Sequence, residues 1–450
     1  MELQAIRRVY FVGVGGIGMS ALARYFVMRG CLVSGYDKTR TPLCAALEAE
    51  GISISYKDRA ESIAPEFVAP SESTLVVYTP AIPADSAILH HFRHAGIKLY
   101  KRSEVLGIIS AGQFCIAVAG THGKTTTSAM IAHILKVTGH DCTAFLGGIA
   151  SNYNSNFIAG ENNVVVVEAD EYDRSFLTLH PDIAVITSMD ADHLDIYGDA
   201  TQLEESFRLF AGQLKAGGTL YVKAGLPLTA LDNYGIGHEG GISATNIRVE
   251  AGHFVFDYKN GSASISGIRM LLPGRHNIEN ALAAISVALK VGIAGDQIKK
   301  ALELFTGVKR RFEYVVRNAD QVYIDDYAHH PEELKACFTA VRELFPGRKL
   351  TVIFQPHLFT RTRDFAEAFA QVLSTVDDLV LLDIYPAREL PIAGINAEFL
   401  LDKVTIQDKK ILNKTQVLAY IEAKYPALLV TVGAGDIDTL VEPLKAIYHA

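Results

Sequence analysis

Cysteine is scarce in this 450-residue chain, and its cysteines do not form pairs along the sequence. They are five in number, widely spaced and without a Cys-x-x-Cys motif, which argues against a zinc site. We therefore expect reduced and mostly buried thiols. The positions are Cys31, Cys44, Cys115, Cys142 and Cys337.

Long apolar runs and dense basic runs are missing as well. No stretch approaches 18 uninterrupted apolar residues, and the first residues lack the apolar core of a signal peptide. We expect a cytoplasmic protein that does not enter a membrane. The net charge of -8, without a concentrated Lys and Arg run, argues against general binding of nucleic acid. An anionic ligand must then be bound by a local site.

Apolar runs of strand length alternate with helical patterns along most of the chain. This alternation predicts an α/β fold with parallel sheets covered by helices. The length is too great for a single core, so we expect three domains. They would cover residues 1–108, 109–313 and 314–450. Between Gly217 and Gly267, short alternating strands with many glycines predict a small antiparallel addition to the middle domain.

A glycine-rich loop follows the apolar segment CIAVA. Gly123, Lys124 and Thr125 match the end of a P-loop motif, although Val118 takes the place of its first glycine. Gly120 gives the tighter form G-T-H-G-K-T, which still follows a strand and opens a helix. In that setting Lys124 reaches the β and γ phosphates and the Thr125 hydroxyl can ligate Mg²⁺. The alternative is an ordinary glycine turn capped by threonines.

Two acidic clusters follow later apolar strands. A metal bound to phosphate needs carboxylates, and sites in parallel sheets open at the carboxyl ends of the strands. Either cluster alone is compatible with a solvated loop or a helix cap, but two of them after a phosphate loop favour metal binding. The candidates are Glu168, Asp170 and Glu171 in the first cluster and Asp190, Asp192, His193 and Asp195 in the second.

The N-terminus carries a second glycine-rich turn. Gly13, Gly15 and Gly18 lie between a strand and a helix, and Asp37 ends the next strand. This is the fingerprint of dinucleotide binding, with an acid placed for a ribose hydroxyl. A diphosphate at a helix N-terminus needs the same glycine turn whether the ligand carries nicotinamide or a sugar. The pattern thus indicates a pyrophosphate and leaves NAD and a nucleotide sugar both open.

Together these stretches resemble the Mur ligase family of peptidoglycan synthesis, and the likeness spans the whole chain. Several motifs in one order are far more specific than any one alone. They are GVGGIGMS (13–20), GTHGKTTT (120–127), EADEYDRSF (168–176), DADHLDIYG (190–198), PGRHNIENALAA (273–284), GVKRRFE (307–313), DDYAHHPEEL (325–334) and QPHLFTRTRDF (355–365).

The resemblance implies a P-loop ATPase-like central domain between two Rossmann-like domains, and an ATP-dependent amide ligase. The lactyl carboxylate of UDP-N-acetylmuramate would take the γ-phosphoryl group of ATP, and the amine of L-alanine would displace phosphate. Two anions that meet in one site need Mg²⁺ or Mn²⁺, Lys and Arg to offset their repulsion. The expected partners are these small molecules, with the chain a monomer or weak homodimer.

The resemblance also implies roles for individual residues. Those expected at ATP are Gly120, Thr121, His122, Gly123, Lys124, Thr125, Thr126, His276, Asn277, Asn280, Arg311 and Asp326. Those expected at the UDP-sugar are Gly13, Gly15, Gly16, Ile17, Gly18, Asp37 and Arg102. Those expected at the amino acid are His329, His330, His357 and Arg361. The expected metal ligands are Thr125, Glu168 and His193. The expected catalytic residues are Lys124, His193, His330 and Arg361.

The chain departs from the family pattern in two places that bear on the site. Related ligases often read PHRYTRT where this chain reads PHLFTRT, so Leu358 and Phe359 replace an arginine and a tyrosine. Arg361 and Arg363 are left as the available guanidinium groups. Some family members use a carbamylated lysine as a metal bridge, but residues 196–214 contain no lysine. Glu204 or Glu205 would be the available substitute.

Three other functions compete with alanine ligation. A muramate ligase that recycles an intact tripeptide resembles the N-terminal half, but its C-terminal signature reads EPRSNTMK where this chain has QPHLFTRT. An NAD-dependent oxidoreductase with an unrelated P-loop and a noncatalytic, nucleotide-switched binding module are rivals from other classes.

Overall fold

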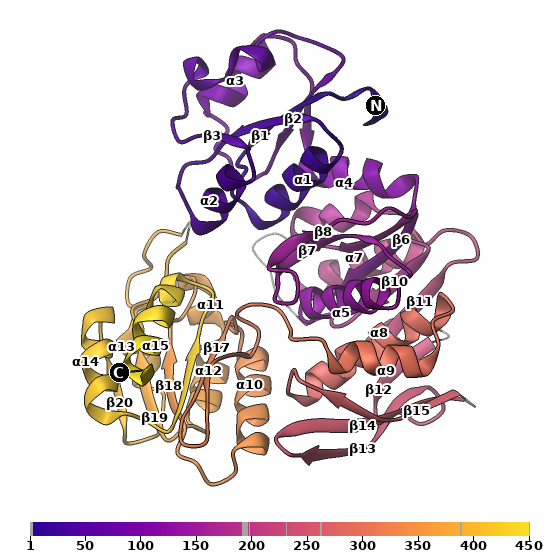
Figure 1. Ribbon diagram of the computed structural model, residues 1–450. Helices are drawn as coiled ribbons and strands as arrows, with labels where there is room; N and C mark the ends of the chain where they lie inside the picture. Colours follow the sequence, from indigo (N-terminus) through magenta and orange to yellow (C-terminus); the bar gives the residue numbers. More distant parts are fainter. Residues whose placement is uncertain are drawn as a thin grey trace. The chain divides into compact units, whose positions relative to one another are not determined.

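The computed structural model describes residues 3–190, 197, 199–230, 232–261, 263–387 and 389–449. These residues form three sheets with their helices (Figure 1). They divide into two compact units. One holds the chain up to Thr245 with Asp257–Ile268 and Glu279–Phe305, and the other holds Asn246–Phe256, Arg269–Ile278 and the chain from Thr306 onward. The domain boundaries expected at residues 108 and 313 stay a prediction.

The N-terminal sheet is parallel throughout, in the order β3-β2-β1-β4-β5. Its elements are β1 (Arg8–Val12), α1 (Ile17–Met28), β2 (Leu32–Tyr36), α2 (Pro42–Ala49), β3 (Ser53–Ser55), β4 (Thr74–Tyr78), α3 (Ala87–His94), β5 (Leu99–Lys101) and α4 (Arg102–Ala111). Val9 and Phe11 pack with α1, while Tyr10 and Val12 pack with α3, so both faces are covered (Figure 1). The strand order reverses beside β1, and ligands bind at such a point. The loop after β1 is therefore well placed for a ligand.

The central sheet is built around β6 (Phe114–Ala119), which lies between two other parallel strands, β10 and β9. Its order is β15-β14-β13-β12-β11-β10-β6-β9-β7-β8. The remaining strands are β7 (Thr143–Ala150), β8 (Ser155–Ile158), β9 (Val164–Glu168), β10 (Ile183–Ile186), β11 (Thr219–Lys223), β12 (Asp232–Ile236), β13 (Ile242–Glu250), β14 (His253–Asn260) and β15 (Ala263–Met270). The helices are α5 (Lys124–Val137), α7 (Ala200–Gly212), α8 (Arg275–Lys290) and α9 (Gly295–Glu303). The loops after β6, β9 and β10 thus share one edge of the sheet.

The antiparallel addition is smaller than the sequence predicts. β11 and β12 pair in parallel, and so do β12 and β13, so this part extends the parallel sheet. Gly237 and Gly240, both with positive φ, lie in the short return between β12 and β13. The successive strands β13, β14 and β15 are neighbours in the sheet and are joined by short turns, as in hairpins.

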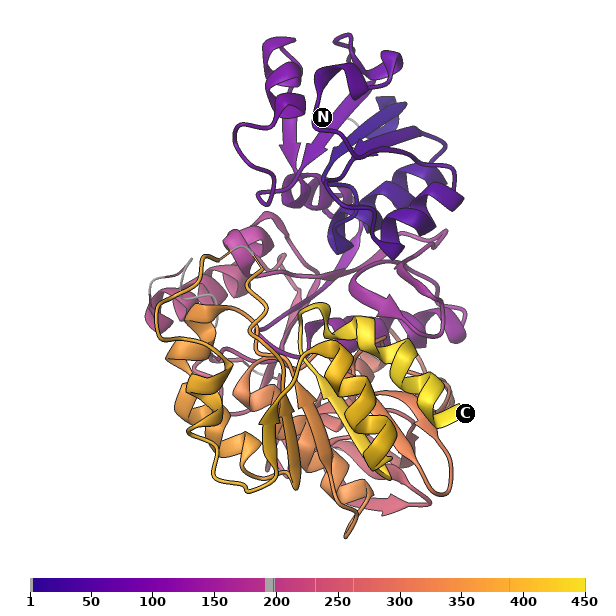
Figure 2. The same cartoon turned by 90° about the vertical axis from the view of Figure 1, so that its left-hand side faces the viewer.

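The C-terminal sheet has the order β16-β17-β21-β18-β19-β20, parallel except for the antiparallel pair β16–β17. Its strands are β16 (Glu313–Arg317), β17 (Val322–Asp326), β18 (Thr351–Phe354), β19 (Asp378–Leu381), β20 (Lys409–Ile411) and β21 (Leu428–Val432). The helices are α10 (Pro331–Leu344), α11 (Phe359–Asp364), α12 (Ala366–Leu373), α13 (Ala397–Leu401), α14 (Lys414–Lys424) and α15 (Val441–His449). Figure 2 shows α10 and α12 on one side of this sheet and α14 and α15 on the other. The segment DDYAHH begins with the last two residues of β17, and QPHLFT follows β18; these two strands flank β21.

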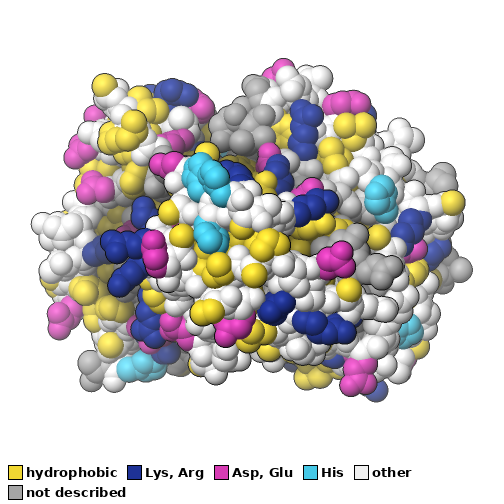
Figure 3. Space-filling model, turned by 90° about the horizontal axis from the view of Figure 1, so that it is seen from above, with side chains coloured by type: hydrophobic (Ala, Val, Ile, Leu, Met, Phe, Trp, Pro, Cys, Tyr) yellow, Lys and Arg dark blue, Asp and Glu magenta, His cyan; other side chains and the backbone are white. Residues whose placement is uncertain are grey.

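The surface and the thiols agree with the composition. Basic and acidic side chains are interspersed on the face drawn in Figure 3. Within the described ranges, no helix is long and apolar enough to cross a membrane. The five cysteines are free thiols, and all but Cys31 are buried, as predicted.

Candidate active site

The loop between β6 and α5 has a backbone that requires glycine at two positions. Gly120 has a φ of +137° and Gly123 a φ of +83°. A Cβ on Gly120 would lie 2.8 Å from the backbone nitrogen of Ser188, and one on Gly123 would lie 2.7 Å from Oδ1 of Asn280. Gly123 directly precedes the first turn of α5, where backbone N–H groups lack helical partners. Such a turn is suited to bind phosphate.

Lys124 is nearly buried in the first turn of α5, beside an acid from the segment after β9. Its Nζ lies 2.7 Å from Oε2 of Glu171 and donates to the carbonyl of Gly120 at 2.5 Å. The two side chains are 13% and 1% exposed. Burial lowers the pKa of Lys124, but the charges of Glu171, Asp170 and Glu168 together outweigh it and raise that pKa. Lys124 is therefore held as a cation at the loop.

Thr125 and Glu168, both expected to bind a metal, are in direct contact. Thr125 Oγ1 donates to Oε1 of Glu168 at 2.9 Å, and the backbone N–H of Gly147 donates to Oε2 at 2.7 Å. A Cβ on Gly147 would lie 2.6 Å from Cδ of Glu168, so glycine leaves the room that this carboxylate occupies. Burial raises the pKa of Glu168, against the charge of Lys124. A hydroxyl and a carboxylate at this spacing fit the preference of Mg²⁺ for oxygen ligands.

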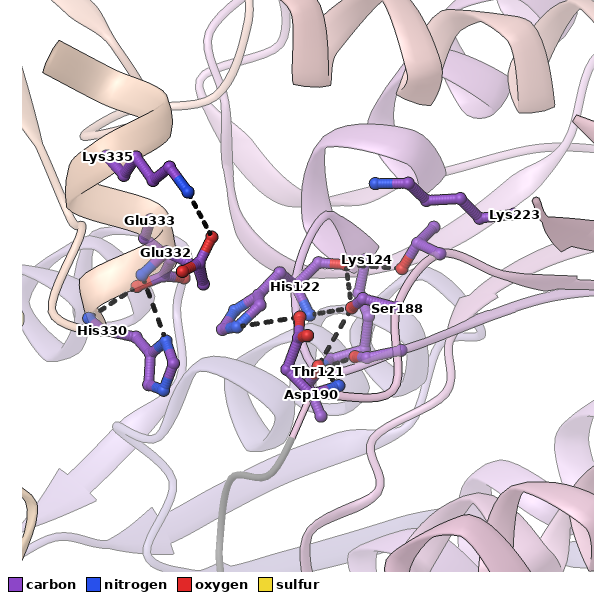
Figure 4. A network of polar contacts seen from close by, with 12 residues as sticks. Thr121, His122, Lys124, Ser188, Asp190, Lys223, His330, Glu332, Glu333 and Lys335 are labelled. Atoms are coloured by element: carbon purple, nitrogen blue, oxygen red, sulfur yellow. Dashed lines mark hydrogen bonds and ion pairs between the residues drawn. The ribbon is translucent and has the colours of Figure 1, made fainter. Parts of the chain in front are cut away.

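The segment after β10 holds the other side of the loop (Figure 4). Ser188 Oγ accepts the backbone N–H of His122 at 2.6 Å and lies 3.0 Å from Thr121 Oγ1. Thr121 Oγ1 in turn accepts the backbone N–H of Asp190 at 3.0 Å. The carboxylate of Asp190 lies 3.6 Å from Nε2 of His122. Asp190, a sequence candidate for metal binding, thus faces a histidine of the phosphate loop.

The expected second metal cannot be placed on described residues. His193, Asp192 and Asp195 lie outside the described residues. Among the residues that the structure describes, no group of three or more His, Cys, Asp or Glu side chains is arranged to hold a metal. The role of His193 stays a prediction.

Glu204 and Glu205, suggested as metal bridges, both pair with an arginine of the same helix. Both lie on the exposed side of α7 and pair with Arg208, at 3.1 Å and 3.5 Å. The spacing of three and four residues puts all three side chains on one helix face, where such pairs form readily. The suggestion that either glutamate replaces a carbamylated lysine stays a prediction.

The N-terminal glycine turn is closed by the acid that the fingerprint predicts. The backbone N–H of Gly15 donates to Oδ2 of Asp37 at 2.8 Å. A Cβ on Gly15 would lie 2.8 Å from the same oxygen, and Gly13 has a φ of +92°. Gly16 caps α1, and Ile17 begins that helix. The turn therefore has the compact form that a diphosphate-binding loop needs.

Arg102 connects this turn with the acidic segment after β9. A Cβ on Gly18 would lie 2.8 Å from Nη1 of Arg102, so the guanidinium lies directly against the start of α1. Its Nη2 lies 3.1 Å from Oδ2 of Asp170. Arg102, which is expected at the UDP-sugar, therefore pairs with Asp170, an acid between Glu168 and Glu171 in the sequence. All of these residues belong to the same compact unit.

Asp326 and Arg311 lie close together in the other unit. Asp326 ends β17, and its oxygens accept the backbone N–H groups of Phe312 and Ala328, both at 2.7 Å. Burial raises the pKa of Asp326 to about 6, although Arg311 lowers it. The Arg311 guanidinium stacks 5.1 Å from the ring of Tyr327. Asp326 is 8% exposed, and its carboxylate is held by these two donors.

Three histidines of the C-terminal unit, His329, His330 and His357, make ring contacts. The rings of His329 and His357 lie 5.8 Å apart, and the ring of His330 packs 4.7 Å from that of Phe365. His330 is also the N-cap of α10, where its Nδ1 accepts a backbone N–H at 3.4 Å. Arg361 is 8% exposed in α11, four residues after His357. Arg363 is instead half exposed and pairs with its neighbour Asp364 at 2.7 Å.

The start of α8 carries the three residues expected at adenine. Asn280 lies against Gly123, as described above. Asn277 is 3% exposed and donates to the carbonyl of Pro273 at 2.6 Å. His276 lines a cavity of about 210 Å³ together with Arg275, Glu332, Lys335, Ala336, Thr339, Ala340 and Glu343. This cavity lies within one compact unit.

Two contributors to the loop escaped the sequence analysis. Ser188 is the second residue after β10 and could have been suspected, because hydroxyls at the ends of parallel strands face such sites. Gly147 gives no comparable signal, since no motif surrounds it. Its importance appears only where its backbone meets Glu168.

Comparison with known proteins decides the family. Residues 8–114, 118–288 and 310–437 match family models described as the Mur ligase catalytic domain, middle domain and glutamate ligase domain. The UDP-N-acetylmuramate–L-alanine ligase of Flavobacterium johnsoniae is 50% identical over 449 residues, which cover 100% of this chain and 99% of that protein. The chain belongs to the Mur ligase family. The ligase of the same name from Christiangramia forsetii is 49% identical, with the same coverage.

Solved structures of Mur ligases share the fold. The UDP-N-acetylmuramate–alanine ligase of Thermotoga maritima has a TM-score of 0.84 and 28% identity, covering 98% of this chain and 99% of that one. A murein peptide ligase of Psychrobacter arcticus has a TM-score of 0.70 and 22% identity, covering 98% of each chain. The α/β fold with three Mur ligase domains is thereby confirmed.

Proposed function

We propose that this chain ligates L-alanine to the lactyl carboxylate of UDP-N-acetylmuramate at the expense of ATP. The products would be UDP-N-acetylmuramoyl-L-alanine, ADP and phosphate, as in peptidoglycan precursor synthesis. The observation that carries the proposal is the 50% identity over the full chain with a relative of that activity. The phosphate-type loop before α5, with Lys124 as a buried cation, supports ATP as the energy source.

The chemistry follows from the weakness of a carboxylate as an acyl donor. A carboxylate oxygen would attack the γ-phosphorus, and ADP would leave, giving an acyl phosphate. The amine nitrogen of alanine would then attack the carbonyl carbon, phosphate would leave, and the nitrogen would lose a proton. Positioning and charge neutralisation dominate such phosphoryl transfers, because charge accumulates on oxygens.

The loop residues 120–126 and Lys124 would bind the ATP phosphates through backbone N–H groups and the ammonium. Thr125 and Glu168 would hold Mg²⁺ or Mn²⁺, since their oxygens already lie 2.9 Å apart. That ion, when bound, would supply positive charge at the phosphates. His193 is proposed as ligand of a second ion. The residues proposed for the rest of the nucleotide are His276, Asn277, Asn280, Arg311 and Asp326.

The other two substrates would use the remaining sites. The turn of Gly13, Gly15 and Gly18, with Asp37 and Arg102, would bind the UDP-sugar rather than NAD. Alanine would meet Arg361 and the three histidines His329, His330 and His357. We place the reaction in the cytoplasm and take the chain to be a monomer or weak homodimer.

Phosphate release tests the proposal directly. The purified chain is given ATP, Mg²⁺, UDP-N-acetylmuramate and a panel of amino acids, with the tripeptide of the recycling ligases as a further amine. Release should require both the sugar nucleotide and an amino acid, and should be fastest with L-alanine. Release that ignores both would point to a nucleotide-switched module, and release with the tripeptide alone to the recycling activity.

A second assay separates the oxidoreductase. A ligand stabilises only the state that it binds, so thermal shifts with uridine and nicotinamide nucleotides distinguish the two sites. We expect a shift with UDP-N-acetylmuramate and none with NAD. The reverse pattern would contradict the assignment of the first glycine turn.

A further inference from the structure

Two acids of the short segment Glu168–Glu171 contact consecutive residues, Lys124 and Thr125. Glu168 accepts the hydroxyl of Thr125 at 2.9 Å. Glu171 accepts the ammonium of Lys124, with its two carboxylate oxygens 2.9 Å and 2.7 Å from Nζ. The first acid has a clear use, because it can ligate a metal beside the phosphates. The second acid has no such use in the proposed reaction.

Glu171 makes the contacts with Lys124 that a bound anion would make. Its side chain is 1% exposed and that of Lys124 is 13% exposed, so both charges are shielded from water. A buried ammonium without a counter-charge is costly, and a buried carboxylate is equally so. Two of the three N–H donors of Lys124 are used by Glu171 and by the carbonyl of Gly120.

A triphosphate that binds at the same loop would bring its own negative charge to this ammonium. Glu171 and the phosphate would then compete for Lys124, and they would also repel each other. We propose that Glu171 is a positioning residue that holds Lys124 at the loop as a placeholder for the phosphate, and that ATP must displace it. This inference rests on the proposed function, because it needs a nucleotide at the loop.

If Glu171 is a placeholder, removing its charge should strengthen nucleotide binding, whereas damage to the fold would weaken it. Glu171→Gln removes the competing charge and keeps nearly the same shape. ADP and ATP should therefore bind more tightly, by about tenfold or more, and KM for ATP should fall. The turnover number should fall too, because ADP leaves more slowly. A side chain with a merely structural role would loosen nucleotide binding when it is changed.

A matched control is available in the same segment. Asp173 pairs with Lys101 at 3.2 Å, and its side chain is 37% exposed. Its φ is +53°, which asparagine tolerates. Asp173→Asn thus makes the same change of charge nearby without touching Lys124. Its affinity for ADP should match that of the wild type.

Calorimetric titration of the full chain with ADP, with and without Mg²⁺, tests the inference. Tighter binding by Glu171→Gln and unchanged binding by Asp173→Asn is the expected result. If Glu171→Gln does not fold, Glu171→Asp withdraws the carboxylate by one methylene and should give a smaller gain. Equal or weaker binding by the folded Glu171 variant would overturn the placeholder role alone. A wild type that binds no ADP would overturn the proposed function itself.

Discussion

Gly147 lies against the carboxylate that is proposed to bind the metal, and the effect of adding a methyl group there can be worked out. The backbone N–H of Gly147 donates to Oε2 of Glu168 at 2.7 Å. A Cβ at this position would lie 2.6 Å from both Cδ and Oε2, well inside van der Waals contact. Gly147→Ala must therefore push the carboxylate away from Thr125 or shift its own strand.

The displaced carboxylate would lose the hydrogen bond that it accepts from the N–H of Gly147. A hydrogen bond to a charged group such as this carboxylate is worth about 1.5–3 kcal/mol. That corresponds to roughly a tenfold to hundredfold loss of metal affinity if the whole effect falls on the metal. Mn²⁺ binding in the presence of ADP, followed by electron paramagnetic resonance, measures it. Binding of UDP-N-acetylmuramate should not change.

A matched glycine separates this effect from a general cost of alanine. Gly212 ends α7, and a Cβ there would meet no atom within 4 Å. Gly212→Ala should bind Mn²⁺ as the wild type does. If Gly147→Ala also binds Mn²⁺ with wild-type affinity, Glu168 is not held by this contact and the reasoning is refuted.

Three further predictions concern the two glycine turns and Asp326. Lys124→Ala should abolish turnover yet keep uridine nucleotide bound, as calorimetry can show; loss of both would indicate misfolding. Gly15→Ala should weaken UDP-N-acetylmuramate and spare ADP, because its Cβ would lie 2.8 Å from Oδ2 of Asp37; equal affinity for the sugar nucleotide would refute this. Burial raises the pKa of Asp326 to about 6, so the folded state keeps a proton that the unfolded chain releases near pH 4. Stability should thus fall by roughly 3 kcal/mol between pH 4 and pH 6, and the melting temperature of the wild type relative to Asp326→Asn should fall with it; a constant difference would show an ordinary pKa.

Much of the fold could be predicted because its signals are local. The strand before Gly120 and the helix after Gly123 are both present, and the glycines have the positive φ that their turn requires. The parallel return between β12 and β13 could not be predicted, because strands so close in sequence usually form hairpins. Only the placement of both strands in the large sheet shows their direction.

The site was predictable in its residue types and not in its pairings. The motif identifies Lys124, and three acids lie within Glu168–Glu171. Which acid meets the lysine depends on the turn that follows, where Asp173 and Arg174 both have positive φ. Sequence spacing contains no information on such a turn. The contact of Gly147 is likewise a tertiary effect, because its partner lies 21 residues away.

Transfer of oxygen from the sugar-linked acid to phosphate tests the central claim most directly. UDP-N-acetylmuramate labelled with ¹⁸O in its lactyl carboxylate is turned over with ATP, Mg²⁺ and L-alanine, and the released phosphate is examined by mass spectrometry. Activation by the γ-phosphoryl group predicts one labelled oxygen in each phosphate released. Phosphate without label, together with formation of the amide, would contradict the account.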